Sequence, residues 1–327
     1  HPTYNKHILF SLYNDNFVLL SYHKFNRRQR LPVSTKGTDL MKLTELFNKG
    51  TPTLSFEVFP PKTSSNFSSV HHAVDEIAAL HPAYMSVTYG AGGSTSKYTV
   101  SIASNILHQF GVTPLAHLTC VCATRDSVSR QLAEMQQQGI ENVLALRGDI
   151  PENAGDPAGW DYTHASDLIA DIKRQSDFCV GGACYPEGHV ESDNFSDDLR
   201  YLKQKIDAGC DFLTTQMFFD NNILYNFLYK IREAGIVVPV VAGIMPVTNA
   251  KQIKRICQLS GTYLPQRFKQ IVDRYGSNPA AMQQAGIAYA TEQVIDLFAN
   301  GVNAVHIYSM NKPEVAAKIQ QNLSEIL

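Results

Sequence analysis

Residues 53–61 read TLSFEVFPP, a run of apolar and β-branched residues that contains one carboxylate, Glu57. Such a run, closed by two prolines, predicts a buried strand, because aromatic and β-branched residues favour extended backbone and proline interrupts strand pairing. Glu57 would then lie among bulky apolar side chains at the end of the strand. Burial of this kind disfavours the charged carboxylate and raises its pKa toward the range that suits a general acid.

Strand-like runs alternate with helical stretches through the rest of the chain, a rhythm that predicts a parallel sheet. We expect strands at about 53–59, 83–89, 113–121, 142–147, 178–184, 211–217, 237–243 and 303–308. We expect helices at about 66–80, 95–110, 125–138, 197–208, 222–234 and 281–300. The seventh connection, from Pro246 to Asn300, must hold more than one helix. Eight strands in this rhythm favour an α/β protein with the (β/α)8 TIM-barrel fold.

An open doubly wound sheet is the competing α/β architecture, and it normally carries a GxGxxG turn after its first strand. The segment Pro60-Pro61-Lys62 occupies that place, and the nearest glycine-rich piece, Gly90-Ala-Gly-Gly-Ser94, follows the second strand without fitting GxGxxG. A flavin or nicotinamide would therefore be held in another way. We expect a single barrel domain at 41–327, after an N-terminal extension at 1–40 that joins no clear period and is poorly ordered or peripheral.

Composition narrows the class of protein and its partners. A 327-residue chain with 44% hydrophobic and 18% charged residues is typical of a globular enzyme, and a net charge of −2 without blocks of like charge argues against a nucleic-acid partner. No apolar run reaches the roughly 18 residues of a membrane span, and the N-terminus lacks a signal-peptide cleavage site. Six cysteines in mostly apolar runs, without the spacing of metal ligands, indicate reduced core thiols, no metal site and a cytoplasmic location.

In a TIM barrel the catalytic groups project from the carboxyl ends of the strands, so polar residues there are candidate site residues. Each has a structural alternative. Glu57 could pair with a Lys or Arg that lines the barrel, and His117 could be a hydrogen-bonded core histidine. Arg147 and Asp149 could form a structural ion pair, although Gly148 between them would let a flat ring lie against the backbone. Asp198, Tyr201 and Lys205 share one helix face that could simply be solvated.

Five motifs in this order, SFEVFPP, the glycine turn from Thr88 to Ser94, LRGD, AxYPEGH and TTQMFFD, resemble the methylenetetrahydrofolate reductase family in its short bacterial form. The resemblance covers roughly Met41 to Leu327. It implies an oxidoreductase that holds FAD non-covalently and reduces 5,10-methylenetetrahydrofolate to 5-methyltetrahydrofolate. NADH or NADPH would reduce the flavin first, in a ping-pong reaction. The resemblance also implies a homo-oligomer.

The resemblance assigns roles to individual residues. It makes Glu57 the general acid, places Asp149 near the flavin and the pterin, and makes Gln216 a pterin contact. The positions that it assigns to the cofactor are Thr88, His117, Arg147, Gly148, Asp149, Ala183, Tyr185, His189, Asp198, Tyr201, Lys205 and Tyr308.

Two residues depart from the family pattern. Tyr201 stands where a bacterial relative has an amide side chain, and Ile256 stands where an aromatic residue can stack on the substrate. The regulatory domain of longer relatives is not expected, so neither is inhibition by S-adenosylmethionine. Two other functions remain open: a non-catalytic folate- or flavin-binding barrel, and a zinc-dependent methyltransferase barrel with ligands from Cys120, Cys122 or Cys184.

Overall fold

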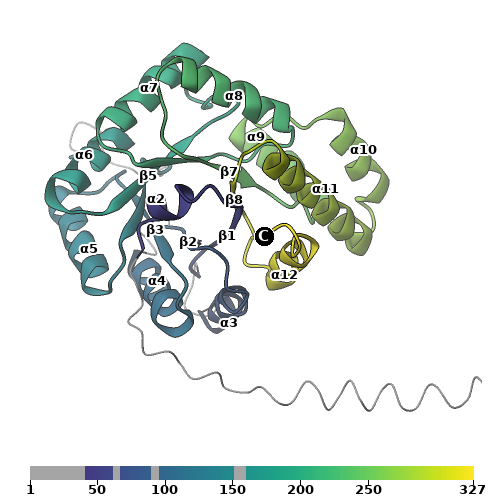
Figure 1. Ribbon diagram of the computed structural model, residues 1–327, viewed down its shortest axis with the longest axis horizontal. Coiled ribbons are helices and arrows are strands. Elements are labelled where there is room, and N and C mark those ends of the chain that lie inside the picture. The colour runs from purple at the N-terminus through teal and green to yellow at the C-terminus, as the bar shows by residue number, and fades with distance from the viewer. Residues whose placement is uncertain (1–40, 62–66, 90–95, 151–159) are drawn as a thin grey trace, which may run out of the picture. The chain divides into compact units, whose positions relative to one another are not determined.

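The computed structural model describes residues 41–61, 67–89, 96–150 and 160–327. Eight parallel strands pair in sequence order, and the last pairs with the first to close a barrel (Figure 1). The strands are β1 (Thr53–Val58), β2 (Met85–Val87), β3 (Pro114–Thr119), β4 (Asn142–Leu146), β5 (Cys179–Cys184), β6 (Phe212–Thr215), β7 (Val240–Ile244) and β8 (Ala304–Ile307). The predicted TIM barrel is therefore confirmed.

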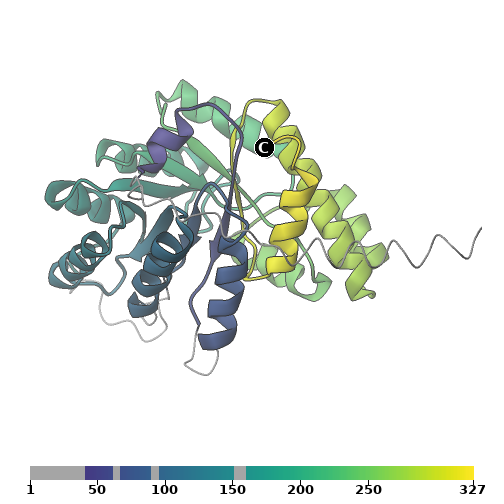
Figure 2. The same cartoon turned by 60° about the horizontal axis from the view of Figure 1, so that its bottom comes forward.

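All the described helices except the first surround the strands on the outside of the barrel, and the first lies over the middle of the barrel in the view of Figure 1 (Figures 1 and 2). In chain order the helices are α2 (Leu43–Phe47), α3 (Phe67–Ala78), α4 (Ser96–Phe110), α5 (Arg125–Gln137), α6 (Ala165–Gln175), α7 (Phe195–Asp207), α8 (Asn221–Glu233), α9 (Ala250–Ser260), α10 (Gln266–Tyr275), α11 (Pro279–Ala299) and α12 (Pro313–Asn322). The long seventh connection holds α9, α10 and α11, which confirms that it contains more than one helix. No helix among the described residues is long and apolar enough to cross a membrane.

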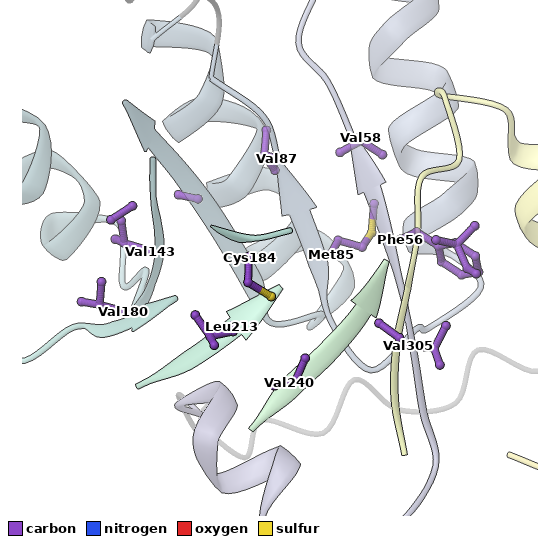
Figure 3. Packing of buried hydrophobic residues seen from close by; sticks show 14 of the residues in the cluster. Phe56, Val58, Met85, Val87, Val143, Val180, Cys184, Leu213, Val240 and Val305 are labelled. Atoms are coloured by element: carbon purple, nitrogen blue, oxygen red, sulfur yellow. The ribbon is translucent and has the colours of Figure 1, made fainter. Parts of the chain in front are cut away.

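Side chains along each strand point alternately out of the barrel and into it, so the strands contribute to two separate apolar clusters. Phe56, Val58 and their counterparts on the other strands form the main core with the helices, and Figure 3 shows part of this packing. A second cluster closes the amino-terminal end of the barrel interior, where the fully buried Leu43 of α2 packs with inward-facing residues such as Phe212. The interior is thus filled at one end, which leaves room for a site at the other.

A buried polar layer lies inside the barrel between that apolar plug and the carboxyl ends of the strands. The His306 ring is held between Ser55 Oγ, 2.7 Å from Nδ1, and Ser86 Oγ, 2.9 Å from Nε2. Tyr84 stacks on the same ring at 5.4 Å between centroids. Burial lowers the pKa of His306 to about 3, so this layer is uncharged at neutral pH. Ser55 precedes Glu57 by two residues, which places Glu57 one layer nearer the carboxyl ends.

Two parts of the chain on which predictions were made lie outside the described residues. These are the extension at 1–40 and most of the glycine turn, at 90–94. Both predictions remain untested.

Candidate active site

A cavity of about 510 Å³ lies at the carboxyl ends of the strands. Its walls come from the ends of β1 to β5, from the amino-terminal part of α6, from most of the length of α7 and from Phe227 of α8. The predicted site residues that line it are Glu57, Thr88, His117, Arg147, Gly148, Asp149, Ala183, Tyr185, His189, Asp198, Tyr201 and Lys205. Barrel closure therefore brings together side chains that are spread over 149 positions of the sequence, from 57 to 205.

Two predicted residues lie beside the cavity and are not among its described lining residues. Gln216 follows β6, and its backbone N–H donates to the Cys184 carbonyl at 2.8 Å. The Tyr308 hydroxyl donates to the Thr215 carbonyl at 2.6 Å. Both belong to the β6–β8 side of the barrel, so their roles toward pterin and flavin stay predictions.

Glu57 and His117 face each other in the cavity, with Oε2 and Nε2 3.8 Å apart. The side chains are only 19% and 7% exposed, respectively. Burial raises the pKa of Glu57 to about 8 and lowers the pKa of His117 to about 3. At neutral pH Glu57 therefore holds a proton and His117 is an uncharged ring. No described Lys or Arg pairs with Glu57, so the ion-pair alternative does not hold for the described chain.

Two buried polar atoms in the cavity wall have no hydrogen-bond partner among the described residues, His117 Nε2 and Thr119 Oγ1. An unpaired buried polar group costs free energy, so such atoms are typical of a surface that a ligand completes. His117 is therefore buried but not the satisfied core histidine of the structural alternative. Thr119 was missed by the sequence analysis, although it lies two residues after His117 and period-two alternation places both on one strand face.

One face of α7 presents Asp198, Tyr201 and Lys205 to the cavity. Lys205 Nζ donates to the Ala183 carbonyl at 2.8 Å, and burial lowers the Lys205 pKa. Asp198 accepts from the His189 backbone N–H at 2.6 Å. Tyr201 is more open, at 39% exposure, and stacks on His164 at 5.8 Å between centroids. The solvated-face alternative is therefore wrong for Asp198 and Lys205.

Arg147 pairs with Glu191 and not with Asp149. Its two terminal nitrogens donate to the two carboxylate oxygens of Glu191 at 2.6 and 2.8 Å. Asp149 is exposed and lines the same cavity. The structural alternative of an Arg147–Asp149 pair is thus wrong, because the loop after β5 brings Glu191 to the guanidinium. Glu191 and His164, which also line the cavity, carry no local sequence signal that would have marked them.

Gly148, between these two residues, has a backbone conformation that favours glycine, with φ of +86°. A Cβ atom there would lie 3.0 Å from both Thr119 Cβ and Val121 Cγ1. The chain after β4 can therefore run close to β3 only without a side chain at this position.

The cysteines do not form a metal site in the described residues, where no three His, Cys, Asp or Glu side chains converge. All six thiols are free. Cys120 is buried, which raises its pKa to about 12, and Cys184 is buried with a raised pKa as well. Cys122 is exposed, so the expectation that the thiols are core residues is wrong for this one. Buried neutral thiols of this kind do not favour the zinc-methyltransferase alternative.

The closed parallel barrel and the polar cavity at its carboxyl ends define a protein of the TIM-barrel enzyme class. The family model of methylenetetrahydrofolate reductase matches residues 42–324, and the chain belongs to this family.

Curated relatives from plants and bacteria support the assignment. A Zea mays protein named methylenetetrahydrofolate reductase (NADH) 1 is 34% identical over 87% of this chain, which spans 50% of that relative's length. Two relatives named 5,10-methylenetetrahydrofolate reductase are matched over nearly their whole length. The Pectobacterium carotovorum protein is 33% identical over 93% of this chain and 97% of its own, and the Escherichia coli protein is 34% identical over 84% and 92%.

A solved structure has the same fold. A Clostridium thermocellum protein that binds two copies of 5-methyl-5,6,7,8-tetrahydrofolic acid superposes with a TM-score of 0.62, over 88% of this chain and 100% of that one. At 14% sequence identity this likeness shows the fold alone.

Proposed function

We propose that this protein reduces 5,10-methylenetetrahydrofolate to 5-methyltetrahydrofolate with NADH or NADPH, through non-covalently bound FAD. Family membership supports the reaction. The observation that carries the proposal is the Glu57 carboxyl, which is mostly buried in the cavity with no described Lys or Arg beside it. Burial raises its pKa to about 8, which keeps a proton available at neutral pH. A non-catalytic folate- or flavin-binding barrel would need no such acid.

The residues that line the cavity fit a large cofactor with polar and anionic parts. The unpaired His117 Nε2 and Thr119 Oγ1 offer hydrogen bonds, and Arg147 and Lys205 supply positive charge. Bound FAD would supply hydride transfer between the nicotinamide and the folate. The chain itself would supply orientation, exclusion of water and a proton, because the deep end of the cavity is closed by the buried layer around His306.

Glu57 would act on the folate. It would donate its proton to a nitrogen of the imidazolidine ring, and the C–N bond would open with its electron pair on that nitrogen. The other nitrogen and the methylene carbon would then form a cationic iminium, which is open to hydride. Neutral His117 supports this role, because a cation at 3.8 Å would favour the ionised form of Glu57 and lower its pKa.

A carboxylate at Asp149 would have two opposing electrostatic effects. It would disfavour negative charge on the reduced flavin, and it would stabilise the cationic iminium of the folate. We expect the second effect to dominate. The Asp149→Asn variant should slow the folate half-reaction by roughly tenfold more than the NADH half-reaction. Rapid mixing of NADH with the oxidised flavoprotein, and of methylenetetrahydrofolate with the previously reduced flavoprotein, measures the two rates, and an unchanged folate rate would remove Asp149 from this role.

The pH dependence of folate reduction tests the proton on Glu57. Since the acid must be protonated and its pKa is about 8, the rate should be flat below that pH and fall about tenfold per pH unit above it. Single-turnover rates between about pH 6 and pH 10 would show the inflection. The Glu57→Gln variant should lack it, and an identical inflection in that variant would assign the titration to another group.

The function itself is tested by colour. The purified protein should be yellow, bleach with NADH or NADPH under anaerobic conditions, and recolour with methylenetetrahydrofolate, with 5-methyltetrahydrofolate as product. A protein that binds flavin or folate but shows no recolouring would support the binding-protein alternative. Stoichiometric zinc without flavin would support the methyltransferase alternative.

A further inference from the structure

The ion pair between Arg147 and Glu191 occupies the mouth of the cavity. It is a planar two-point contact, because Nη1 and Nη2 each donate to a different oxygen of the same carboxylate. The third guanidinium nitrogen, Nε, donates to the Gly148 carbonyl at 3.3 Å. The hydrogen bond to Glu191 raises the pKa of Arg147 and lowers that of Glu191. The guanidinium is thus already engaged by an anion of the protein.

An anionic ligand in the cavity would also need Arg147 as a positively charged hydrogen-bond donor. Arg147 and Lys205 are the only Lys or Arg side chains among the described lining residues. Lys205 already donates to the Ala183 carbonyl. The carboxyl groups of the lining, from Glu57, Asp149, Glu191 and Asp198, offer no positive charge. A guanidinium binds carboxylate and phosphate through the same two-point geometry, so a ligand phosphate and Glu191 would compete for the same donors.

The Glu191 carboxylate can leave Arg147 easily. Its side chain is 55% exposed, whereas the Arg147 side chain is 29% exposed. Water screens an ion pair at such a site, and a ligand phosphate would restore the two hydrogen bonds of Arg147, so the carboxylate can turn into solvent at small net cost. Glu191 lies in the loop between β5 and α7, and it can move without disturbing a strand or a helix of the barrel.

We propose that the Glu191 carboxylate occupies the place of a ligand phosphate on Arg147. It holds Arg147 at the cavity mouth until the pyrophosphate of an incoming dinucleotide displaces it. Glu191 thereby weakens dinucleotide binding by competition. This inference rests on the proposed function, because the dinucleotide in question is FAD.

Neutralising the competitor should tighten binding. The Glu191→Gln variant should bind FAD roughly threefold to tenfold more tightly than the parent, as expected when an exposed carboxylate that competes for Arg147 is neutralised. Dilution of the FAD-loaded full chain, followed by the rise in flavin fluorescence, gives the dissociation constant. Riboflavin, which has the same ring but no phosphate, should bind both proteins equally when it is titrated as a competitor.

Two variants control for the loss of a negative charge and for the role of Arg147. Asp193→Asn removes the same charge from an exposed position two residues away and should leave the FAD dissociation constant unchanged. In an Arg147→Gln background, Glu191→Gln should no longer tighten FAD binding, because the contested donor is gone.

The outcomes separate this inference from the proposed function. A purely structural role for the ion pair would weaken FAD binding in Glu191→Gln, and that result overturns the inference. Unchanged FAD binding, or equal tightening for riboflavin, overturns it as well while the parent protein still binds FAD. A folded parent protein that binds no FAD would overturn both the inference and the proposed cofactor.

Discussion

Replacing Glu57 by glutamine is expected to slow folate reduction by about 10²- to 10⁴-fold, which is the usual contribution of a positioned general acid. Glutamine keeps the size of the protonated carboxyl but has no proton to transfer. The substitution also keeps the charge, since a group with a pKa of about 8 is mostly neutral at pH 7. Flavin reduction by NADH or NADPH needs no proton from this position, so its rate should change by no more than about threefold.

Anaerobic rapid mixing measures the two half-reactions separately. Glu314→Gln, the same substitution in the exposed first turn of α12, is the matched control and should leave both rates unchanged. Equal loss of both half-reactions in Glu57→Gln would mean that the residue supports flavin binding and not proton transfer. Retention of full folate activity would remove the acid role altogether.

The Gly286→Ala substitution is expected to destabilise the barrel by about 3 kcal/mol, although helix propensity alone would favour alanine by about 1 kcal/mol. Gly286 is buried in α11, against the loop after β7. A Cβ atom there would lie 1.8 Å from the carbonyl oxygen and 2.7 Å from the carbonyl carbon of Val247. Both obstacles are backbone atoms, so relief requires α11 to move away from the barrel.

Thermal unfolding measures this effect, and a loss of about 3 kcal/mol corresponds to a fall in Tm of roughly 5 °C for a domain of this size. Gln284→Ala, two residues earlier on the exposed side of α11, is the control and should change stability by less than about 0.5 kcal/mol. A Gly286→Ala protein as stable as its parent would show that α11 and the Val247 loop do not pack as described.

Much of the site could be predicted because the apolar runs of the sequence indicate where each strand ends. Glu57, His117 and Arg147 each end or follow an apolar run, and barrel closure places the ends of such runs at one rim. The helix face with Asp198 and Lys205 was readable from spacing. The rim positions of Gln216 and Tyr308 were also readable, but their contacts with a ligand remain predictions, since both lie outside the described cavity lining.

The sequence by itself determined the eight-strand barrel and the place of Glu57 at the end of a buried apolar strand, because apolar runs and the strand–helix rhythm are local properties of the chain. Only the tertiary structure decided which side chains meet. Glu57 faces His117 from 60 positions away, and Arg147 faces Glu191 from 44. Contacts of this range depend on how strands close and loops fold back, which neighbouring residues along the chain do not encode.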